Sequence, residues 1–153
     1  MHYFPTLILT PTLPPRKGHA MNDHALQEVR DTAKELVRAF GSHDKESYFD
    51  FFSKEATFIF YNHPEVLASR QEWFELWETW EKQNNFRIRS CDSHEQRVEM
   101  LAPDLAIFSH AVRTSIEMDG RVEAVTERET IVFSRRGGRW VAVHEHLSPH
   151  EVL

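Results

Sequence analysis

The sequence predicts an α+β domain in which three helices precede a curved, mostly antiparallel sheet. Two patterns lead to this prediction. Apolar residues recur at helical spacing in the first half of the chain, and from residue 86 onward the chain is rich in strand-forming residues separated by short turns. With 153 residues, the chain is long enough for one domain with a single hydrophobic core.

The N-terminal residues 1–20 differ from the rest because they contain four prolines: Pro5, Pro11, Pro14 and Pro15. Proline cannot continue a helix or a central strand. We expect residues 1–20 to form a disordered tail, which an upstream start codon chosen in error would explain, with a docking arm as the alternative. The folded domain is then expected over residues 21–153. The apolar run at residues 7–9 is too short to cross a bilayer, so no membrane contact is expected.

Three helices are expected before the main part of the sheet. The first begins at Asn22, a good N-cap, and ends at Gly41, and the second covers roughly residues 44–52. The third begins at a capping box over residues 69–72 and carries a stripe of large apolar side chains at positions i, i+3, i+4 and i+7: Trp73, Leu76, Trp77 and Trp80. Such a stripe is most typical of a hydrophobic core, and it is also compatible with the wall of a ligand pocket.

Five strands are expected. The first covers residues 56–61, and four more cover approximately residues 86–101, 105–118, 121–136 and 139–148. The turns between the last four lie at residues 102–104, 119–120 and 137–138. The last two turns are two-residue hairpin loops that contain glycine, which adopts the positive φ that such loops need. Tight turns between consecutive strands predict an antiparallel meander.

These turns also predict the register of the sheet, because a tight turn determines which residues lie opposite each other. Counting from the turns places His110 opposite Glu129, Glu129 opposite His146, and Gln96 opposite His110. The result is a polar row across the otherwise apolar face that must cover the helices, with His144 two residues from His146 on the same face. A self-satisfied hydrogen-bond network and a pocket floor suited to proton transfer are both compatible with this row. A β-bulge would break the inference.

The opposite face of the last two strands is expected to hold several apolar side chains, together with Arg128 and Glu145. The other side chains expected on this face are Thr130, Val132, Val141, Val143 and Leu147. Apolar side chains on the outer face of a sheet suggest a protein partner. We therefore expect a homodimer joined through this outer sheet face.

Charge and cysteine content narrow the class of protein. The net charge is −6 and the basic residues are scattered along the chain, which argues against a nucleic-acid surface. The single cysteine, Cys91, excludes an internal disulfide and indicates a reducing compartment, so a cytoplasmic location is expected. Ten histidines can titrate near neutral pH, and the many aromatic residues can line a pocket.

The end of the chain resembles a known family. The segments at residues 129–133, 135–140 and 144–148, with residues 60–63 before the third helix, are similar to the SnoaL-like subgroup of the nuclear transport factor 2-like superfamily. That subgroup includes the association domain of calcium/calmodulin-dependent protein kinase II. The resemblance implies a cone-shaped barrel in which three N-terminal helices pack on a strongly curved sheet. It also implies no cofactor and no metal.

Relatives in this superfamily include ketosteroid isomerases, scytalone dehydratase, polyketide cyclases and non-catalytic assembly or binding domains, so the fold does not choose the function. Two departures bear on the ligand. In the kinase association domain, arginines reach the pocket from positions that match Ile131 and Leu147, so the resemblance favours a small apolar or neutral ligand here. No pair matching the acidic dyad of the isomerases is evident, which argues against a ketosteroid isomerase proper.

The leading functional hypothesis is a cofactor-independent lyase, isomerase or cyclase that acts on a small apolar carbonyl compound. In it, Glu129 and His146 form the acid–base pair and His110 polarises the substrate oxygen. The substrate-binding residues are expected to be Tyr61, Trp73, Trp77, Gln96 and His144. The alternative is a non-catalytic ligand-binding or dimeric assembly module that uses the same pocket. A third interpretation is a site for Fe(II) or Zn(II) made of two histidines and one carboxylate.

Overall fold

The computed structural model describes residues 18–151, so most of the expected tail lies outside the described residues. The helices are α1 (Gly18–Gly41), α2 (Lys45–Asp50) and α3 (Arg70–Asn84). The strands are β1 (Phe52–Phe60), β2 (Arg87–Ala102), β3 (Leu105–Met118), β4 (Arg121–Arg136) and β5 (Arg139–Pro149). Helix α1 therefore begins four residues before Asn22, the start expected from its capping residue, and includes the last three residues of the expected tail.

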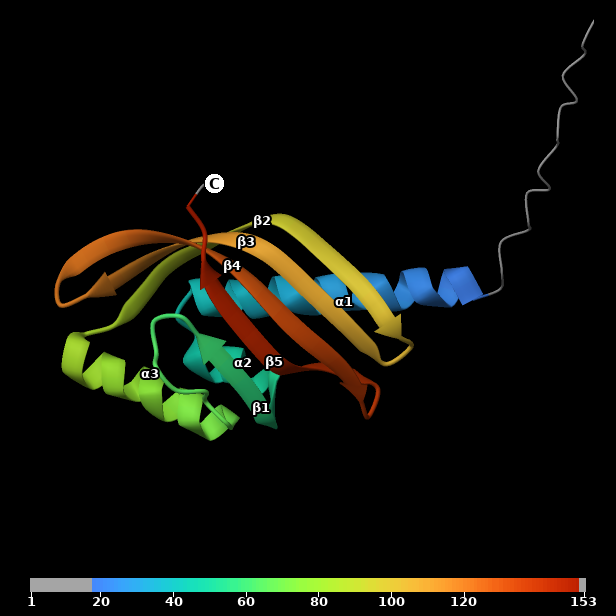
Figure 1. The fold of residues 1–153 in the computed structure, drawn as a ribbon, viewed down its shortest axis with the longest axis horizontal. Helices are drawn as coiled ribbons and strands as arrows, with labels where there is room; N and C mark the ends of the chain where they lie inside the picture. Colours follow the sequence, from blue (N-terminus) through green and yellow to red (C-terminus); the bar gives the residue numbers. More distant parts are fainter. Residues whose placement is uncertain (1–17, 152–153) are drawn as a thin grey trace, which may run out of the picture.

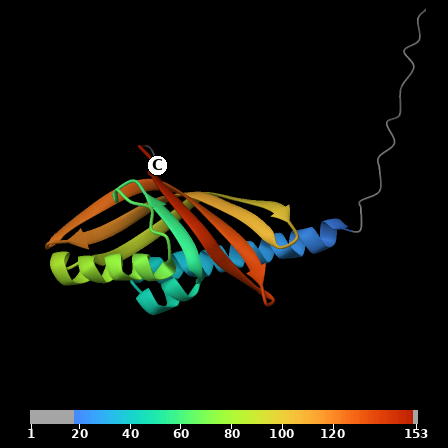
Figure 2. The same ribbon diagram turned by 60° about the horizontal axis from the view of Figure 1, so that its bottom comes forward.

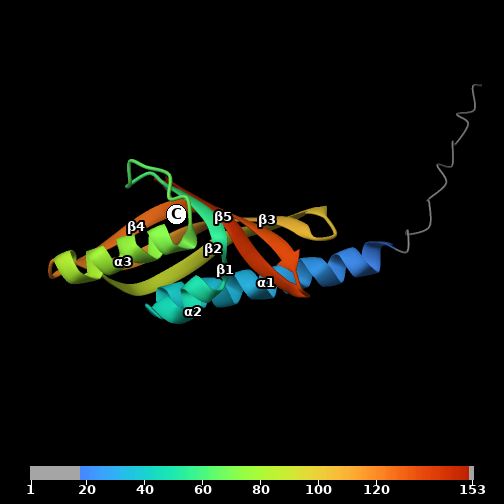
Figure 3. The same ribbon diagram turned by 90° about the horizontal axis from the view of Figure 1, so that it is seen from below.

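The five strands form one strongly curved sheet with the order β1-β5-β4-β3-β2. Strand β1 pairs in parallel with β5, and all the other pairs are antiparallel. The three helices lie on the concave side of this sheet (Figure 1). Helix α1 packs against β2 and β3, and α3 packs against β1, as the turned views also show (Figures 2 and 3). This is the α+β cone predicted from the sequence.

The hydrophobic core lies between the concave face of the sheet and the helices. The sheet contributes buried side chains at the positions expected from its alternation, among them Ile88, Phe108, Ile131, Phe133, Trp140 and Ala142. Trp77 of α3 is completely buried and packs against the rings of Phe40, Phe49 and Phe86. Trp77 therefore belongs to the core, where its indole N–H has no hydrogen-bond partner in the part of the chain that the structure describes.

The predicted register is confirmed at two hairpins and wrong beyond a β-bulge. His110 pairs with Glu129, and Arg136 pairs with Arg139, as counted from the turns. Further along the last hairpin, Phe133 pairs with Ala142 but the preceding Val132 pairs with His144, so β5 contains one extra residue. Glu129 consequently lies opposite Leu147 instead of the expected His146. A one-residue shift reverses the side-chain alternation of a strand.

The bulge exchanges the two faces of the end of β5. Glu145 and Leu147, both expected on the outer face, line the interior of the cone. His144 lies on the outer face, where its Nδ1 is 2.7 Å from the hydroxyl oxygen of Thr57, and His146 is exposed. Compared with the expected outer face, the observed one lacks Leu147 and includes the side chains of His144 and His146.

A second irregularity changes the position of Gln96. The register of β2 shifts between His94 and Arg97, next to Glu95, which has a positive φ of 51°. The Gln96 side chain is exposed, so it does not form part of the polar row on the inner face. Ser93, which was not expected in the row, takes its place beside His110.

No helix in the described part of the chain is long and apolar enough to cross a membrane.

The homodimer stays a prediction. Val132 and Val141 remain half-buried on the outer face, and Ile59 of β1 exposes 37% of its surface. Val141→Glu would place a charge in this face, and a charge without a partner is costly in an interface. We expect light scattering to give a dimer for the unmodified protein and a monomer for Val141→Glu. A variant that stays dimeric, or a parent protein that is monomeric, would contradict the prediction.

Candidate functional site

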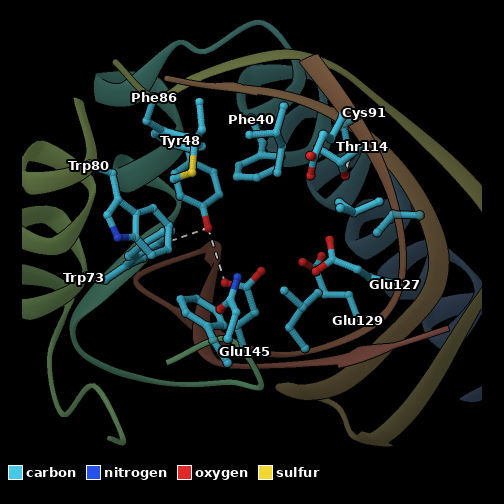
Figure 4. Close-up of a pocket in the computed structure, with 18 of the residues that line it drawn as sticks. Phe40, Tyr48, Trp73, Trp80, Phe86, Cys91, Thr114, Glu127, Glu129 and Glu145 are labelled. Atoms are coloured by element: carbon cyan, nitrogen blue, oxygen red, sulfur yellow. Dashed lines mark hydrogen bonds between the residues drawn. The ribbon is translucent and has the colours of Figure 1, made fainter. Parts of the chain in front are cut away.

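The interior of the cone contains a cavity of about 820 Å³, large enough for a small organic molecule. Its wall has two chemically different sides (Figure 4). Aromatic side chains from the helices form one side, and three glutamates from the last two strands form the other. The cavity therefore combines an apolar surface with a concentrated set of acidic groups.

The aromatic side of the cavity comes from α3 and its neighbours. Trp73 and Trp80 lie two turns apart on α3 and both line the cavity. Their rings are in contact, with centroids 5.5 Å apart, and Trp80 also contacts Phe86 at 5.4 Å. Phe40 from α1 and Tyr48 from α2 complete this wall. Edge-on ring contacts of this kind make the surface well packed as well as apolar.

The acidic side of the cavity follows from strand alternation and the bulge. Glu127 and Glu129 are two residues apart on β4, so both project from the same face of the sheet. The bulge turns Glu145 of β5 toward the same space. Glu127 exposes 6% of its surface and Glu145 exposes 3%, and all three carboxyl groups line the cavity (Figure 4).

Glu145 is connected to the helices through Tyr48. The Tyr48 hydroxyl donates a hydrogen bond to Oε2 of Glu145 over 3.2 Å, and it accepts one from the indole N–H of Trp73, also over 3.2 Å. Because the indole nitrogen can only donate, the Tyr48 proton must point toward Glu145. Burial and the nearby carboxyl of Glu145 raise the pKa of Tyr48 well above its ordinary value, so the phenol keeps its proton.

Glu129 is connected to the edge of the sheet through His110. The His110 Nε2 lies 2.9 Å from Oε1 of Glu129, and its Nδ1 lies 2.6 Å from the Ser93 hydroxyl. The side-chain amide of Gln96 donates to that hydroxyl over 2.8 Å. Ser93 is thus free to donate to Nδ1, and the Nε2 proton of His110 points to Glu129.

The protonation of Glu129 and the protonation of Glu145 depend on each other. Burial raises the pKa of Glu145 well above its ordinary value, and the neighbouring Glu129 raises it further. Burial also raises the pKa of Glu129, but a hydrogen bond from Glu145 opposes this shift. Two adjacent buried carboxylates cannot both be ionised at low cost, so one proton remains on the pair. We place it on Glu145, since Glu129 already accepts a hydrogen bond from Nε2 of His110.

His110 stays neutral in this arrangement. Burial lowers its pKa to about 4, although the nearby Glu145 acts in the opposite direction. His110 exposes only 2% of its surface and lies behind Glu129, outside the set of side chains that line the cavity. It therefore supports and orients Glu129, and the expectation that it polarises a substrate oxygen directly is not compatible with its position.

Comparison with known proteins assigns the chain to a family. The family model described as the SnoaL-like domain matches residues 29–150. The chain belongs to this family. No curated protein matches it.

Solved structures agree with the fold of this SnoaL-like domain. A ketosteroid isomerase-like protein from Erwinia carotovora atroseptica is 14% identical, with a TM-score of 0.72 over 85% of this chain and 99% of that one. A protein provisionally described as a scytalone dehydratase, from Novosphingobium aromaticivorans, is 9% identical, with a TM-score of 0.71 over 86% and 88%. An NTF2-like protein of unknown function in nutrient uptake from Rhodospirillum rubrum is 18% identical, with a TM-score of 0.70 over 80% and 98%.

The SnoaL-like domain brings together some of the site residues expected from sequence. Glu129 and Trp73 line the cavity, and His110 supports Glu129. Tyr61 is exposed by 47%, and its hydroxyl lies close enough to Glu127 to influence that carboxyl group.

The other expected site residues lie elsewhere. His144 and His146 are on the outer face because of the bulge in β5, Gln96 is exposed because of the bulge in β2, and Trp77 is in the core. The pair of His146 with Glu129 is therefore wrong.

Sequence reasoning missed four residues of the site: Tyr48, Trp80, Glu127 and Glu145. Trp80 belongs to the recognised aromatic stripe, and Glu127 shares strand and face with Glu129, so the pattern could have indicated both. Glu145 could not be found without the bulge. Within residues 18–151, no group of three or more histidine, cysteine or acidic side chains is arranged to hold a metal ion.

Cys91 also lines the cavity, and its side chain is a protonated thiol rather than a thiolate. Burial raises its pKa to about 12, and the Thr114 hydroxyl lies 3.6 Å from its sulfur. The reactive form of cysteine is the thiolate, so Cys91 is not suited to act as a nucleophile near neutral pH.

The state of His110 can be measured by ¹⁵N nuclear magnetic resonance, with His110→Asn to assign the signal. We expect the ring to remain neutral down to about pH 5, with the proton on Nε2, because burial disfavours the imidazolium. Titration near the ordinary value of about 6.5 would contradict the proposed network, as would a proton on Nδ1.

Proposed function

We propose that this cavity catalyses proton transfer at a carbon atom next to a carbonyl group, as an isomerase, lyase or cyclase reaction requires. One observation carries the proposal: two buried carboxyl groups, those of Glu129 and Glu145, line a largely apolar cavity beside the hydroxyl of Tyr48. An ionised carboxylate and a neutral acid side by side are the two groups that such a reaction needs.

Glu129 is the base in this scheme. Its carboxylate accepts a hydrogen bond from Nε2 of His110, and it lines the cavity. Its carboxylate takes a proton from the carbon next to the substrate carbonyl and becomes a carboxylic acid. Burial raises its pKa above the ordinary value, which makes it a stronger base than an exposed glutamate.

In this scheme the carbonyl oxygen of the substrate replaces the internal acceptors, so that Glu145 and Tyr48 turn their protons toward it and stabilise the negative charge that develops there. Both carry a proton, and their oxygens lie 3.2 Å apart at one side of the cavity. Hydrogen-bond donors that are held close to the developing charge stabilise an enolate more effectively than water does. The resulting enol or enolate then regains a proton from Glu129 at a different carbon, which is isomerisation, or expels a leaving group, which is elimination.

The roles of the histidines change accordingly. His110 is a positioning residue, since it reaches the substrate only through Glu129. His144 and His146 have no part in the scheme because they lie on the outer face. The solved structures described as ketosteroid isomerase-like and as a scytalone dehydratase support this class of chemistry only through their fold. The competing hypothesis is a cavity that binds a ligand without converting it.

Exchange of ketone α-protons for deuterium tests the proposal without knowledge of the natural substrate. We expect the protein to accelerate the exchange of 2-indanone or 2-tetralone in D₂O, followed by proton nuclear magnetic resonance. Glu129→Gln should reduce the acceleration by about 10²–10⁴-fold, because it removes the base while keeping the shape of the side chain. Glu99→Gln, an exposed position on β2 outside the cavity, serves as the matched control.

Glu145→Gln makes a further distinction. The rate of the unmodified protein should fall at low pH, where the pair takes up a second proton, and again at high pH, where it loses the one it has. Glutamine keeps a neutral donor and cannot ionise, so this variant should retain part of the activity and lose the fall at high pH. Exchange no faster than in buffer with both ketones would support a binding protein instead, and full exchange by Glu129→Gln would show that Glu129 is not the base.

A further inference from the structure

We propose that the ligand of this cavity carries a positively charged amino group, bound by Glu127, on an apolar body that packs against the aromatic wall. The proposal extends the function given above, because it names the class of substrate for the same site. The charges lining the cavity, the environment of Glu127 and the position of the aromatic side chains each contribute to it.

Acidic residues strongly outnumber basic residues among the side chains that line the cavity. Three buried or nearly buried glutamates face the interior, and Asp119 and Glu123 add two more acidic groups. Arg121 is the single basic residue among the described residues that line the cavity, and its side chain is exposed. His110 behind Glu129 is neutral. Even with one proton shared by Glu129 and Glu145, the interior favours a cation and repels an anion.

Glu127 is the one of the three glutamates that belongs to neither the Tyr48 nor the His110 hydrogen-bond network. It is 94% buried, faces the cavity and forms no ion pair among the described residues. Burial raises its pKa and the nearby Glu145 raises it further, while the hydroxyl of Tyr61 compensates only in part. A buried carboxylate without a cationic partner is unfavourable, and an ammonium group on a ligand would supply that partner.

The distance between Glu127 and the acid–base pair suits a molecule with two functional groups. Glu127 and Glu129 are alternate residues on one strand, so their side chains are about 6–7 Å apart along β4. An ammonium group at Glu127 thus leaves the pair of Glu129 and Glu145 free for a carbonyl group a few bonds away. Proton removal at that site would be assisted by the nearby positive charge.

The aromatic wall provides the complementary surface. Phe40, Trp80 and Phe86 line the cavity opposite the three glutamates (Figure 4). Aromatic rings bind an apolar body through its buried surface, and their faces also attract a cation. The apolar ligand expected from the sequence is therefore retained in this proposal, with a positive charge added at one end.

Three ligands with one ring system and different charges test the proposal. We would measure by titration calorimetry the affinity of 2-aminoindane, which is cationic at neutral pH, of 2-indanol, which is neutral, and of indane-2-carboxylate, which is anionic. We expect the amine to bind about tenfold or more tighter than the alcohol, because hydrogen bonds between charged groups are the strong ones. The carboxylate should bind most weakly.

Variants assign the effect to one residue. Glu127→Gln should remove the advantage of the amine and leave the affinity for 2-indanol within about twofold, whereas Glu99→Gln should preserve the tenfold difference. The alcohol binding as tightly as the amine would overturn the proposal, as would an advantage that survives Glu127→Gln, or no measurable binding of the amine at millimolar concentration.

These outcomes are independent of the catalytic test. Loss of deuterium exchange in Glu129→Gln together with equal binding of amine and alcohol would leave the proposed chemistry in place and exclude the cationic ligand. Preferential amine binding without accelerated exchange would support the cationic ligand and exclude the proposed chemistry.

Discussion

Glu129 and Glu145 project from neighbouring strands into one buried cavity, and a single shared proton prevents two negative charges from meeting there. Much of the interior is arranged around this pair. On one side, Glu145 accepts from Tyr48 of α2, which in turn accepts from Trp73 of α3. On the other, Glu129 accepts from His110 of β3, which is held by Ser93 of β2. Hydrogen bonds thus connect helices and four strands through two carboxyl groups.

This chain of donors and acceptors also determines which groups can react. The direction of the hydrogen bonds in it follows from chemistry, because the Trp73 indole can only donate and the Ser93 hydroxyl accepts a hydrogen bond from the side-chain amide of Gln96. The Glu129 carboxylate uses one oxygen to accept from His110, and it can accept a further proton on the side of the cavity. A buried polar network is costly unless every member is satisfied, and the one carboxyl group of this wall outside the network is Glu127, which only the Tyr61 hydroxyl compensates in part. That difference separates the residues that we assign to chemistry from the residue that we assign to ligand binding.

The sequence was sufficient to predict the helices, the meander and most of the sheet register. Glycine-containing turns determine the pairing near each hairpin, and the correct pairing of His110 with Glu129 followed from that rule. The bulge in β5 could not be predicted in the same way, because no glycine or proline marks it. Histidine, glutamate and histidine occupy residues 144–146, so either alternation places polar groups on both faces. The apolar pattern therefore gave no signal for the shift.

Other parts of the site depended on tertiary packing. Trp77 and Trp80 belong to one aromatic stripe, yet Trp77 is enclosed by other rings while Trp80 meets the cavity. Helical spacing shows that such residues share a face but not which of them borders empty space. Tyr48 lies in a helix of only six residues, where nothing in the local pattern indicates contact with a strand almost a hundred residues later.

The shared proton itself is the most direct test of this account. Carbon-13 labelling of the glutamate carboxyl groups, with Glu145→Gln and Glu129→Gln to assign the signals, reports the protonation of each by nuclear magnetic resonance. We expect the Glu145 carboxyl to remain protonated well above the ordinary glutamate pKa of about 4.3, and to lose this property when Glu129 is replaced by glutamine. Ionisation of both carboxyl groups below about pH 5 in the unmodified protein would contradict the account.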